Sequence, residues 1–454
     1  MIDNELLPFD HLIRGGRVVD PSQDLDAVRD VLIRNGKIGA IGESVNVSDL
    51  ELSPDQITDA EGLVVVPGLI DGRVYFGEPG HEHRETIQSG LSAAAAGGFT
   101  SVIHWGWTTP ANDHRAMTQS LLAAAEQAGT ARLHPVGCLS RGGCGEELAE
   151  LGELAEAGCV AFADGGRPQT NAALLRRALL YALHFGVPVA SRAVDPQLVG
   201  EAVVHEGAWS TRLGLAGVSA TAEEVVVARD LLLVAETGGR YHLAPASLGG
   251  SAARVRRAKD AGLAVTCDVP ISHLLLTDEA TSSYGFSPAV RFEPPLRPEE
   301  HVEALRAALA DGTIDCIVSD HRPHHADEKD VQFSVAPPGA VGLEILVSLC
   351  LDRLVGEGVV DLGRLVELLS TGPARVFGLN EASGAGSLRP GGVADVTLLD
   401  LDREVEVDAS GFRSLGRSTP FDGWKLRGAP VGTFVGGHKI NLDRDSTQPS
   451  SQGS

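Results

Sequence analysis

Short apolar runs separated by glycine and aspartate mark both ends of the chain. In residues 1–66 these runs alternate with turn residues, and Asn35-Gly36 between two of them is typical of a tight β-hairpin. Residues 386–442 repeat the pattern near the other end. Because the two ends share a pattern that the middle lacks, we expect them to assemble into one small β-sandwich.

The middle of the chain, residues 67–385, alternates helix-like and strand-like segments. The spacing of residues 89–96 predicts a helix that ends at Gly97-Gly98, and residues 100–104 form an apolar run typical of a buried strand. This alternation predicts a parallel α/β fold, most simply a (β/α)8 barrel, and a doubly wound sheet is the other arrangement that alternation allows. A helical stretch followed by an extended one recurs at residues 172–191, 252–267 and 301–318.

Net charge and cysteine content indicate which partners and which compartment the protein is expected to have. A net charge of −24 argues against binding to nucleic acid or to an anionic membrane surface. The acidic N-terminus lacks the features of a signal peptide, and no apolar run is long enough to span a bilayer. Six cysteines without a regular spacing indicate a reducing compartment. We therefore expect a cytoplasmic protein whose Ser- and Gln-rich tail, residues 443–454, is disordered.

A family motif begins where the N-terminal β-region ends. Residues 66–80 have the sequence VPGLIDGRVYFGEPG and resemble the signature of dihydroorotases and related cyclic amidohydrolases. The resemblance covers nearly the whole chain. It implies a barrel that carries a metal site beside a β-sandwich from both chain ends, which is the fold that the pattern predicts. Further matches follow in order at residues 160–165, 273–279, 294–297, 319–324 and 420–424.

The residues at the family's metal-binding positions are of the wrong types to bind a metal. Alignment with the family's motifs places its four histidine ligands on Arg73, Tyr75, Arg192 and Pro245. Arginine carries a permanent positive charge and proline has no donor atom. Only Asp320 is retained, at the position of the aspartate that serves the family as acid/base group, and one carboxylate does not hold zinc.

The substrate-binding positions differ from the family as well. The arginine that binds the substrate carboxylate falls on Gly77, and two asparagines fall on Trp107 and Glu293. Since dihydroorotate is an anion, a glutamate in place of an asparagine disfavours its binding. Loss of both sets of residues predicts a protein that has no metal cofactor and is catalytically inactive.

Two further expectations concern the altered site. Asp320 is expected to be vestigial and to form an ion pair with Arg73 or Arg192, because an unpaired buried carboxylate is costly. Trp105 and Trp107 are expected to fill the space of the former pocket, with an aromatic recognition surface as the alternative.

Three functions are compatible with these residues. The first, implied by the resemblance, is an inactive dihydroorotase homologue that acts as structural or regulatory partner of aspartate carbamoyltransferase in de novo pyrimidine biosynthesis, within a homo- or hetero-oligomer. The second is an active cyclic amidohydrolase whose zinc binds at a relocated site. The third is a metal-free binder of an anion at Arg73 and Arg192. The relocated zinc site would be formed by His81, His83, His321, His324 and Asp320.

Overall fold

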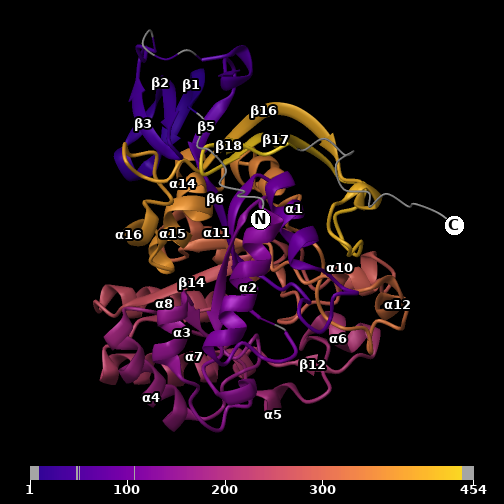
Figure 1. Cartoon of the computed structure of the whole chain (residues 1–454). Coiled ribbons are helices and arrows are strands. Elements are labelled where there is room, and N and C mark those ends of the chain that lie inside the picture. The colour runs from indigo at the N-terminus through magenta and orange to yellow at the C-terminus, as the bar shows by residue number, and fades with distance from the viewer. Residues whose placement is uncertain (1–9, 48–49, 51, 107, 442–454) are drawn as a thin grey trace, which may run out of the picture.

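The computed structural model describes the chain except for residues 1–9, 48–49, 51, 107 and 442–454 (Figure 1). The tail that the sequence predicts to be disordered lies outside the described residues. Among the helices that are described, none is both long and apolar enough to cross a membrane.

Eight parallel strands form the larger unit, a nearly closed barrel. Each strand is paired in parallel with the next along the order from β6 to β15. A parallel bridge between Val74 and His321 connects the chain after the last strand back to β6 and so brings the two edges together. The strands are β6 (Leu69–Val74), β7 (Phe99–His104), β8 (Arg132–Gly137), β9 (Ala161–Phe162), β10 (Val189–Ser191), β13 (Tyr241–Leu243), β14 (Val265–Pro270) and β15 (Cys316–Val318).

Helices follow the strands and cover the outside of the barrel (Figure 1). Thr86 and Asn171 cap two of them, since each side chain accepts a hydrogen bond from a backbone N–H of the first turn. The strand–helix alternation predicted for the middle of the chain is confirmed as a (β/α)8 barrel. The longest helices are α1 (Ile87–Ala96), α2 (Arg115–Ala128), α4 (Ala172–Ala182), α7 (Thr221–Thr237), α8 (Gly249–Asp260) and α11 (Glu299–Ala310).

Shorter helices and strands lie in the segments that connect the barrel elements. A two-stranded parallel ribbon pairs β11 (Val204–His205) with β12 (Gly217–Val218). The short helices are α3 (Leu151–Ala157), α5 (Pro196–Val199), α6 (Ala208–Leu213), α9 (Ser272–Leu275), α10 (Ala280–Ser283), α12 (Ala326–Lys329), α13 (Leu346–Cys350), α14 (Leu362–Val366), α15 (Gly372–Val376) and α16 (Leu379–Ser383).

A second sheet is built from both chain ends, as the sequence predicts. β16 pairs antiparallel with β5, which places a C-terminal strand beside an N-terminal one. Asn35 and Gly36 form the predicted hairpin with φ of 51° and 70°, values that a type I′ turn requires. All the strands belong to one continuous sheet. They are β1 (His11–Asp20), β2 (Leu25–Arg34), β3 (Lys37–Gly42), β4 (Ile57–Asp59), β5 (Val64–Pro67), β16 (Val396–Glu406), β17 (Lys425–Val435) and β18 (His438–Lys439).

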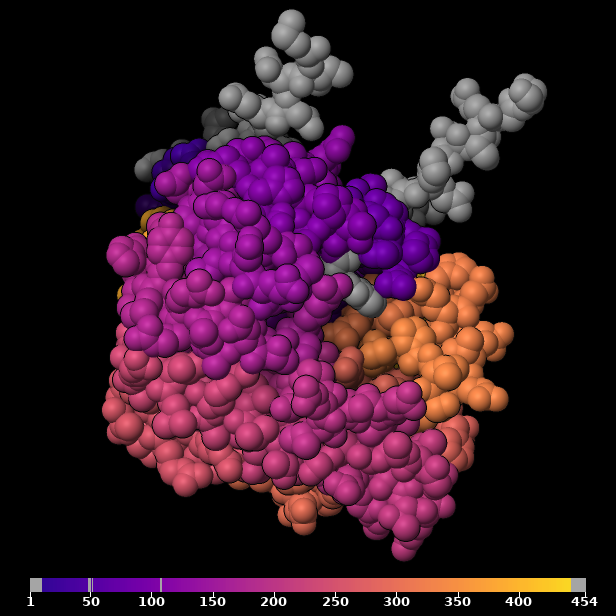
Figure 2. Space-filling model, turned by 90° about the horizontal axis from the view of Figure 1, so that it is seen from below, coloured from indigo at the N-terminus to yellow at the C-terminus, as the bar shows by residue number. Residues whose placement is uncertain are grey.

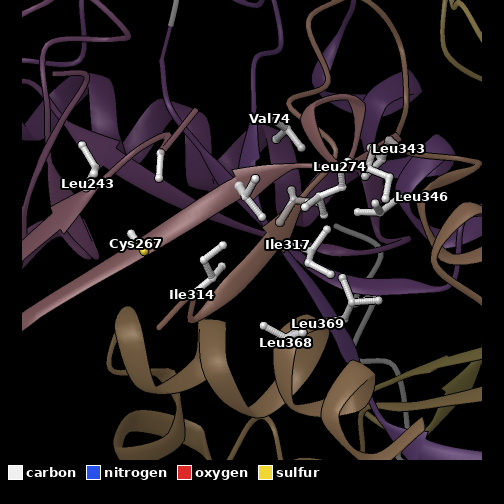
Figure 3. Close-up of a cluster of buried hydrophobic side chains, with 14 of the residues drawn as sticks. Val74, Leu243, Cys267, Leu274, Ile314, Ile317, Leu343, Leu346, Leu368 and Leu369 are labelled. Carbon is white, nitrogen blue, oxygen red and sulfur yellow. The ribbon is translucent and has the colours of Figure 1, made fainter. Parts of the chain in front are cut away.

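The largest apolar cluster lies between the barrel strands and the surrounding helices. Figure 3 shows a part of it around the last strand, where Ile317 of β15 lies near Leu346 and Leu369 from later segments. These three side chains are at most 1% exposed. A separate cluster fills the barrel interior and includes Tyr75 and Trp105. The barrel is therefore a packed core, and chemistry is confined to its ends.

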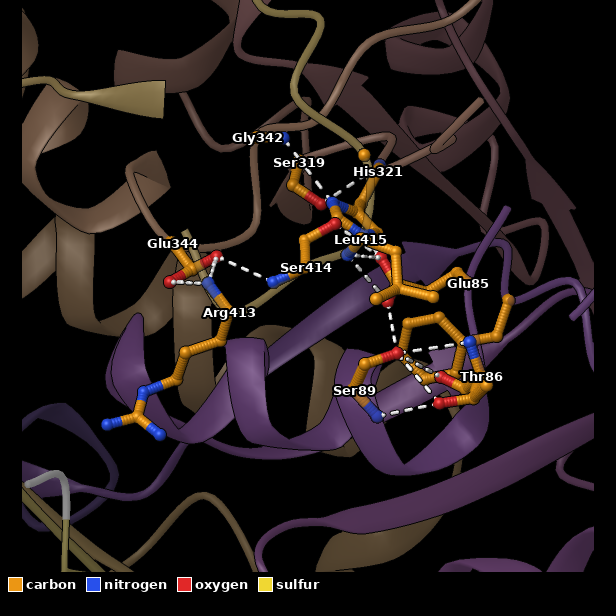
Figure 4. Close-up of polar contacts among 12 residues, drawn as sticks. Glu85, Thr86, Ser89, Ser319, His321, Gly342, Glu344, Arg413, Ser414 and Leu415 are labelled. Atoms are coloured by element: carbon orange, nitrogen blue, oxygen red, sulfur yellow. Dashed lines mark hydrogen bonds and ion pairs between the residues drawn. The ribbon is translucent and has the colours of Figure 1, made fainter. Parts of the chain in front are cut away.

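The segment that connects β16 to β17 is anchored to the barrel by the buried carboxylate of Glu85 and the half-buried carboxylate of Glu344 (Figure 4). Glu85 is fully buried and accepts hydrogen bonds from the hydroxyls of Ser89 and Ser414 and, at 3.1 Å, from the backbone N–H of Leu415. Glu344 accepts from the backbone N–H of Ser414 at 3.1 Å. The C-terminal segment thus donates to one carboxylate just before α1 and to another just before α13, both far away in the sequence.

Replacing Glu85 by alanine tests this anchor. The change leaves the hydroxyls of Ser89 and Ser414 and the backbone N–H of Leu415 without this acceptor, and we expect the free energy of unfolding to fall by roughly 2–4 kcal/mol. Urea denaturation of Glu85→Ala beside Glu126→Ala, whose side chain is exposed on α2, measures the difference. Equal midpoints for the two variants would contradict the anchoring role.

Candidate active site

The residues at the family's catalytic positions lie together at one end of the barrel, where the strands have their carboxyl ends. Arg73 lies near the end of β6, Arg192 directly follows β10, and Asp320 follows β15. Active sites of parallel barrels form at this end because loops of variable sequence meet there. In Figure 2 the surface dips between the purple segments of the first barrel units and the orange segments of the last ones.

A buried guanidinium lies at the bottom of the site. Nη2 of Arg73 is 3.0 Å from Oδ1 of Asp268, and its Nε is 3.0 Å from Oδ1 of Asp320. Nε2 of His242 lies 3.2 Å from the other oxygen of Asp268. The N–H vectors of Arg73 are not well aligned with the carboxylate oxygens, so charge rather than directed hydrogen bonding accounts for the two short contacts.

Electrostatics keep this arginine charged. Burial by itself favours the neutral form, but the carboxylates of Asp268 and Asp320 outweigh it and raise the pKa of Arg73. The Arg73 side chain is 1% exposed. At the position of the family's first metal ligand, this protein therefore has a permanently charged arginine side chain.

Asp320 has a backbone conformation that few residues adopt. Its φ is 51°, in the left-handed region, where aspartate is one of the tolerated residue types. Its carboxylate is also 4.0 Å from Nη2 of Arg322. The ion pair expected between Asp320 and an arginine is present with Arg73, whereas Arg192 pairs elsewhere.

The second arginine at a ligand position pairs with a glutamate. Nη2 of Arg192 lies 2.6 Å from Oε1 of Glu293, and its Nη1 donates to the carbonyl of Gly166 at 3.1 Å. Burial raises the pKa of Glu293, but Arg192 together with Arg322 and Arg291 lowers it overall. Pro245 lines the same pocket as these two side chains.

Aromatic side chains fill the space beside Arg73. Trp105 is 1% exposed and donates from its indole N–H to the carbonyl of Gly72 at 2.8 Å. Tyr75 is buried, which raises its pKa, and the guanidinium of Arg322 lies 4.3 Å from the centre of its ring. Trp105 therefore fills the site, as the sequence predicts. Trp107 lies outside the described residues.

Gly77 lies where the family has its carboxylate-binding arginine. A Cβ atom at this position would lie 2.2 Å from the carbonyl oxygen of His81, and that loop is closed by a hydrogen bond of 2.6 Å from the His81 N–H to the Gly77 carbonyl. The turn therefore excludes any side chain, and an arginine here would require a different loop.

The side chains of the relocated zinc site do not converge. Among the described residues, no group of three His, Cys, Asp or Glu side chains is arranged to hold a metal ion. The donor atoms that a zinc ion would need are directed at protein partners, so these residues do not fit the group. His81 lies 3.2 Å from the Thr109 hydroxyl, His83 3.9 Å from Glu328, His321 3.5 Å from Glu85, and His324 3.0 Å from the Pro338 carbonyl.

Four contributors to the site were missed by sequence reasoning. Asp268 gave a usable signal, since it is a lone carboxylate inside the apolar strand β14. His242 lies in the same way within β13. Arg291 and Arg322 lie in loops, where a charged residue is ordinary and carries no signal.

Comparisons with known proteins identify the class. A solved structure, L-hydantoinase (dihydropyrimidinase) from Arthrobacter aurescens, matches with a TM-score of 0.83 at 26% identity over 95% of this chain and 96% of that chain. The model of the dihydro-orotase-like family matches residues 62–248. Proteins named dihydroorotase from Anaeromyxobacter dehalogenans and Pelotomaculum thermopropionicum are 49% and 47% identical, over 94% and 95% of this chain and 97% and 99% of theirs. The fold is thus that of the cyclic amidohydrolases. Within them, this chain belongs to the dihydroorotase-like family.

The same relatives contradict the first functional hypothesis. Proteins that share nearly the whole length of the chain are named for the enzyme, and nothing in the comparisons indicates an inactive partner of aspartate carbamoyltransferase. That hypothesis inferred lost catalysis from the residue types at Arg73, Tyr75, Arg192 and Pro245. The residue types at these four positions do not show which charged side chains surround them in the folded protein.

Replacing Arg73 by methionine tests the buried ion pairs. The carboxylates of Asp268 and Asp320 would then lie buried without a countercharge, and we expect a loss of about 3–5 kcal/mol in the free energy of unfolding. Adding Asp320→Asn should restore part of the loss, because the two residues are coupled. Chemical denaturation measures both effects. Arg176→Met, at an exposed arginine paired with Glu236, is the control and should change little. An equally small effect of Arg73→Met would show that Arg73 does not balance the buried charges of Asp268 and Asp320.

Proposed function

We propose that the protein catalyses the dihydroorotase reaction of pyrimidine biosynthesis, the reversible hydrolysis of the cyclic amide of dihydroorotate. The observation that carries the proposal is the identity of 45–49% to proteins named dihydroorotase over 94% of the chain. Identity of this extent includes the barrel, the second sheet and the loops at the mouth. The Gly77 turn and the Arg73 ion pairs are therefore features of a dihydroorotase-like protein with an unusual site.

The side chain available for proton transfer is Asp320. Opening a cyclic amide needs a base that takes a proton from water and an acid that delivers it to the leaving nitrogen. Asp320 lies at the carboxyl ends of the strands, and its side chain is 8% exposed, at the boundary between the buried ion pairs and the mouth. Since the residues present do not fit zinc, no step is assigned to a metal.

The proposed step uses only groups of the chain and water. The Asp320 carboxylate accepts a proton as the water oxygen bonds to the carbonyl carbon. The carbon–nitrogen bond of the ring then breaks, and Asp320 returns the proton to the nitrogen. Arg73 does not reach the mouth and acts as a positioning residue, because its charge holds the Asp320 carboxylate in place.

A turnover assay in both directions tests this function. The purified full chain is assayed with dihydroorotate and with its ring-opened product, once with added zinc and once with a chelator. We expect turnover that the chelator does not change. Asp320→Asn should lower kcat by at least about 100-fold. Asp327→Asn, at an exposed carboxylate in the short helix α12, should leave kcat unchanged.

Three outcomes would count against parts of the proposal. Absence of turnover in every metal condition would contradict the function itself. Turnover that the chelator abolishes would keep the function but contradict the metal-free step. Full activity of Asp320→Asn would remove Asp320 from the reaction.

A further inference from the structure

Three arginines surround one glutamate at the rim of the barrel mouth. Arg192 contacts Glu293 at 2.6 Å, and the charges of Arg322 and Arg291 act on the same carboxylate. Arg291 directly follows the short helix η5 (Pro288–Val290), so Arg291 and Glu293 belong to one loop. Arg192 comes from another barrel unit, directly after β10. The cations thus reach Glu293 from separate barrel units.

Three arginines act on Glu293, and a lysine lies beside them. Lys329 adjoins them, and its pKa is lowered to about 7 by burial, with Arg291 and Arg322 contributing. An excess of buried positive charge is unfavourable unless an anion balances it. The arginines that act on Glu293 are Arg192, Arg291 and Arg322, whereas Arg297, which lines the same pocket, is paired with Glu223.

Arg291 is the cation without a carboxylate of its own. Its Nη1 donates to the carbonyl of Phe292 at 2.8 Å, and its buried Nε has no hydrogen-bond partner among the described residues. No carboxylate of the described chain lies within ion-pair distance of it. The buried Nε of Arg192 likewise has no partner in this part of the structure. Two donors near Glu293 are therefore available to a further acceptor.

The surroundings of these groups are apolar except for the paired side chains of Arg297 and Glu223. Arg192, Arg291 and Glu293 line one pocket together with Val203, Pro294 and other apolar side chains. Little free space is left between them, but the Glu293 side chain is 35% exposed whereas that of Arg192 is 10% exposed. Glu293 is accordingly the member that can turn out into solvent while the arginines stay in place.

We propose that this pocket is a carboxylate-exchange site. Glu293 holds the place of a ligand carboxylate, and a small ligand that carries a carboxylate on a compact apolar or ring framework displaces it from Arg192, with Arg291 as second donor. That the ligand is a carboxylated cyclic amide rests on the proposed function, whereas the exchange itself needs no turnover. The site replaces the carboxylate recognition that the Gly77 turn excludes.

Binding of orotate, measured by calorimetry on the full chain, tests the exchange. Uracil is the matched probe, because it is the same ring without the carboxylate. We expect uracil to bind at least about tenfold more weakly than orotate, since charge-assisted hydrogen bonds to the carboxylate are lost. An uncharged ligand has no reason to displace Glu293.

Substitutions then separate a competing carboxylate from a structural ion pair. Glu293→Gln removes the competitor and should tighten orotate binding by about tenfold, while Arg192→Gln and Arg291→Gln should each weaken it by about tenfold or more. Arg176→Gln, an exposed arginine on α4, is the matched control and should leave binding unchanged. Thermal melting of every variant confirms that it is folded.

The outcomes distinguish this site from the proposed activity. Orotate binding that weakens or stays constant in Glu293→Gln would overturn the exchange, and so would equal binding of orotate and uracil or absence of orotate binding in both wild type and Glu293→Gln. The expected changes in orotate binding, found in a protein that shows no turnover, would support the exchange site and contradict the proposed function. Turnover of dihydroorotate without the expected binding changes would support the proposed function and overturn the exchange site.

Discussion

The paired contacts of Arg73 with Asp268 and Asp320 are the interaction on which the barrel mouth depends. Arg73 belongs to β6, Asp268 to β14, and Asp320 follows β15, so one side chain connects the first strand with the last two. The barrel closes between β6 and β15, where the bridge joins Val74 and His321, the residues that directly follow Arg73 and Asp320. Buried charges of opposite sign therefore hold together the seam at which the mouth forms. Their removal one at a time is costly because the partners stay buried.

This arrangement explains how a dihydroorotase-like barrel is folded with non-ligand residues at the family's metal positions. A metal site places positive charge among carboxylate and histidine ligands at the strand ends. Here a guanidinium supplies that charge: it contacts Asp268 and Asp320, and His242 contacts Asp268 from the other side of the carboxylate. Trp105 and Tyr75 occupy the remaining volume, so the interior stays densely packed. The polar chemistry of the site is displaced outward to the rim, where Arg192, Arg291 and Glu293 lie.

The sequence predicted the local elements better than the tertiary arrangement of the sheet and the site. The hairpin at Asn35-Gly36, the helix before Gly97-Gly98 and the shared β-pattern of the two ends were confirmed, because local periodicity and turn residues determine such features. The β-sandwich expected from the ends is one continuous sheet, since β16 pairs directly with β5. The hypothesis of an inactive partner was wrong, because residue types at aligned positions do not reveal the charge balance around them.

The sequence by itself determined the barrel, the sheet from both ends and the family, since these follow from periodicity and motifs that are local in the chain. It also determined that histidine ligands are absent from the family's positions. Only the tertiary structure decided which carboxylates Arg73 contacts, that Gly77 excludes a side chain, and that Arg291 has no carboxylate partner in the described chain. The contacts of Arg73 join residues 195 and 247 positions apart in the sequence, and no local pattern encodes their distance in space.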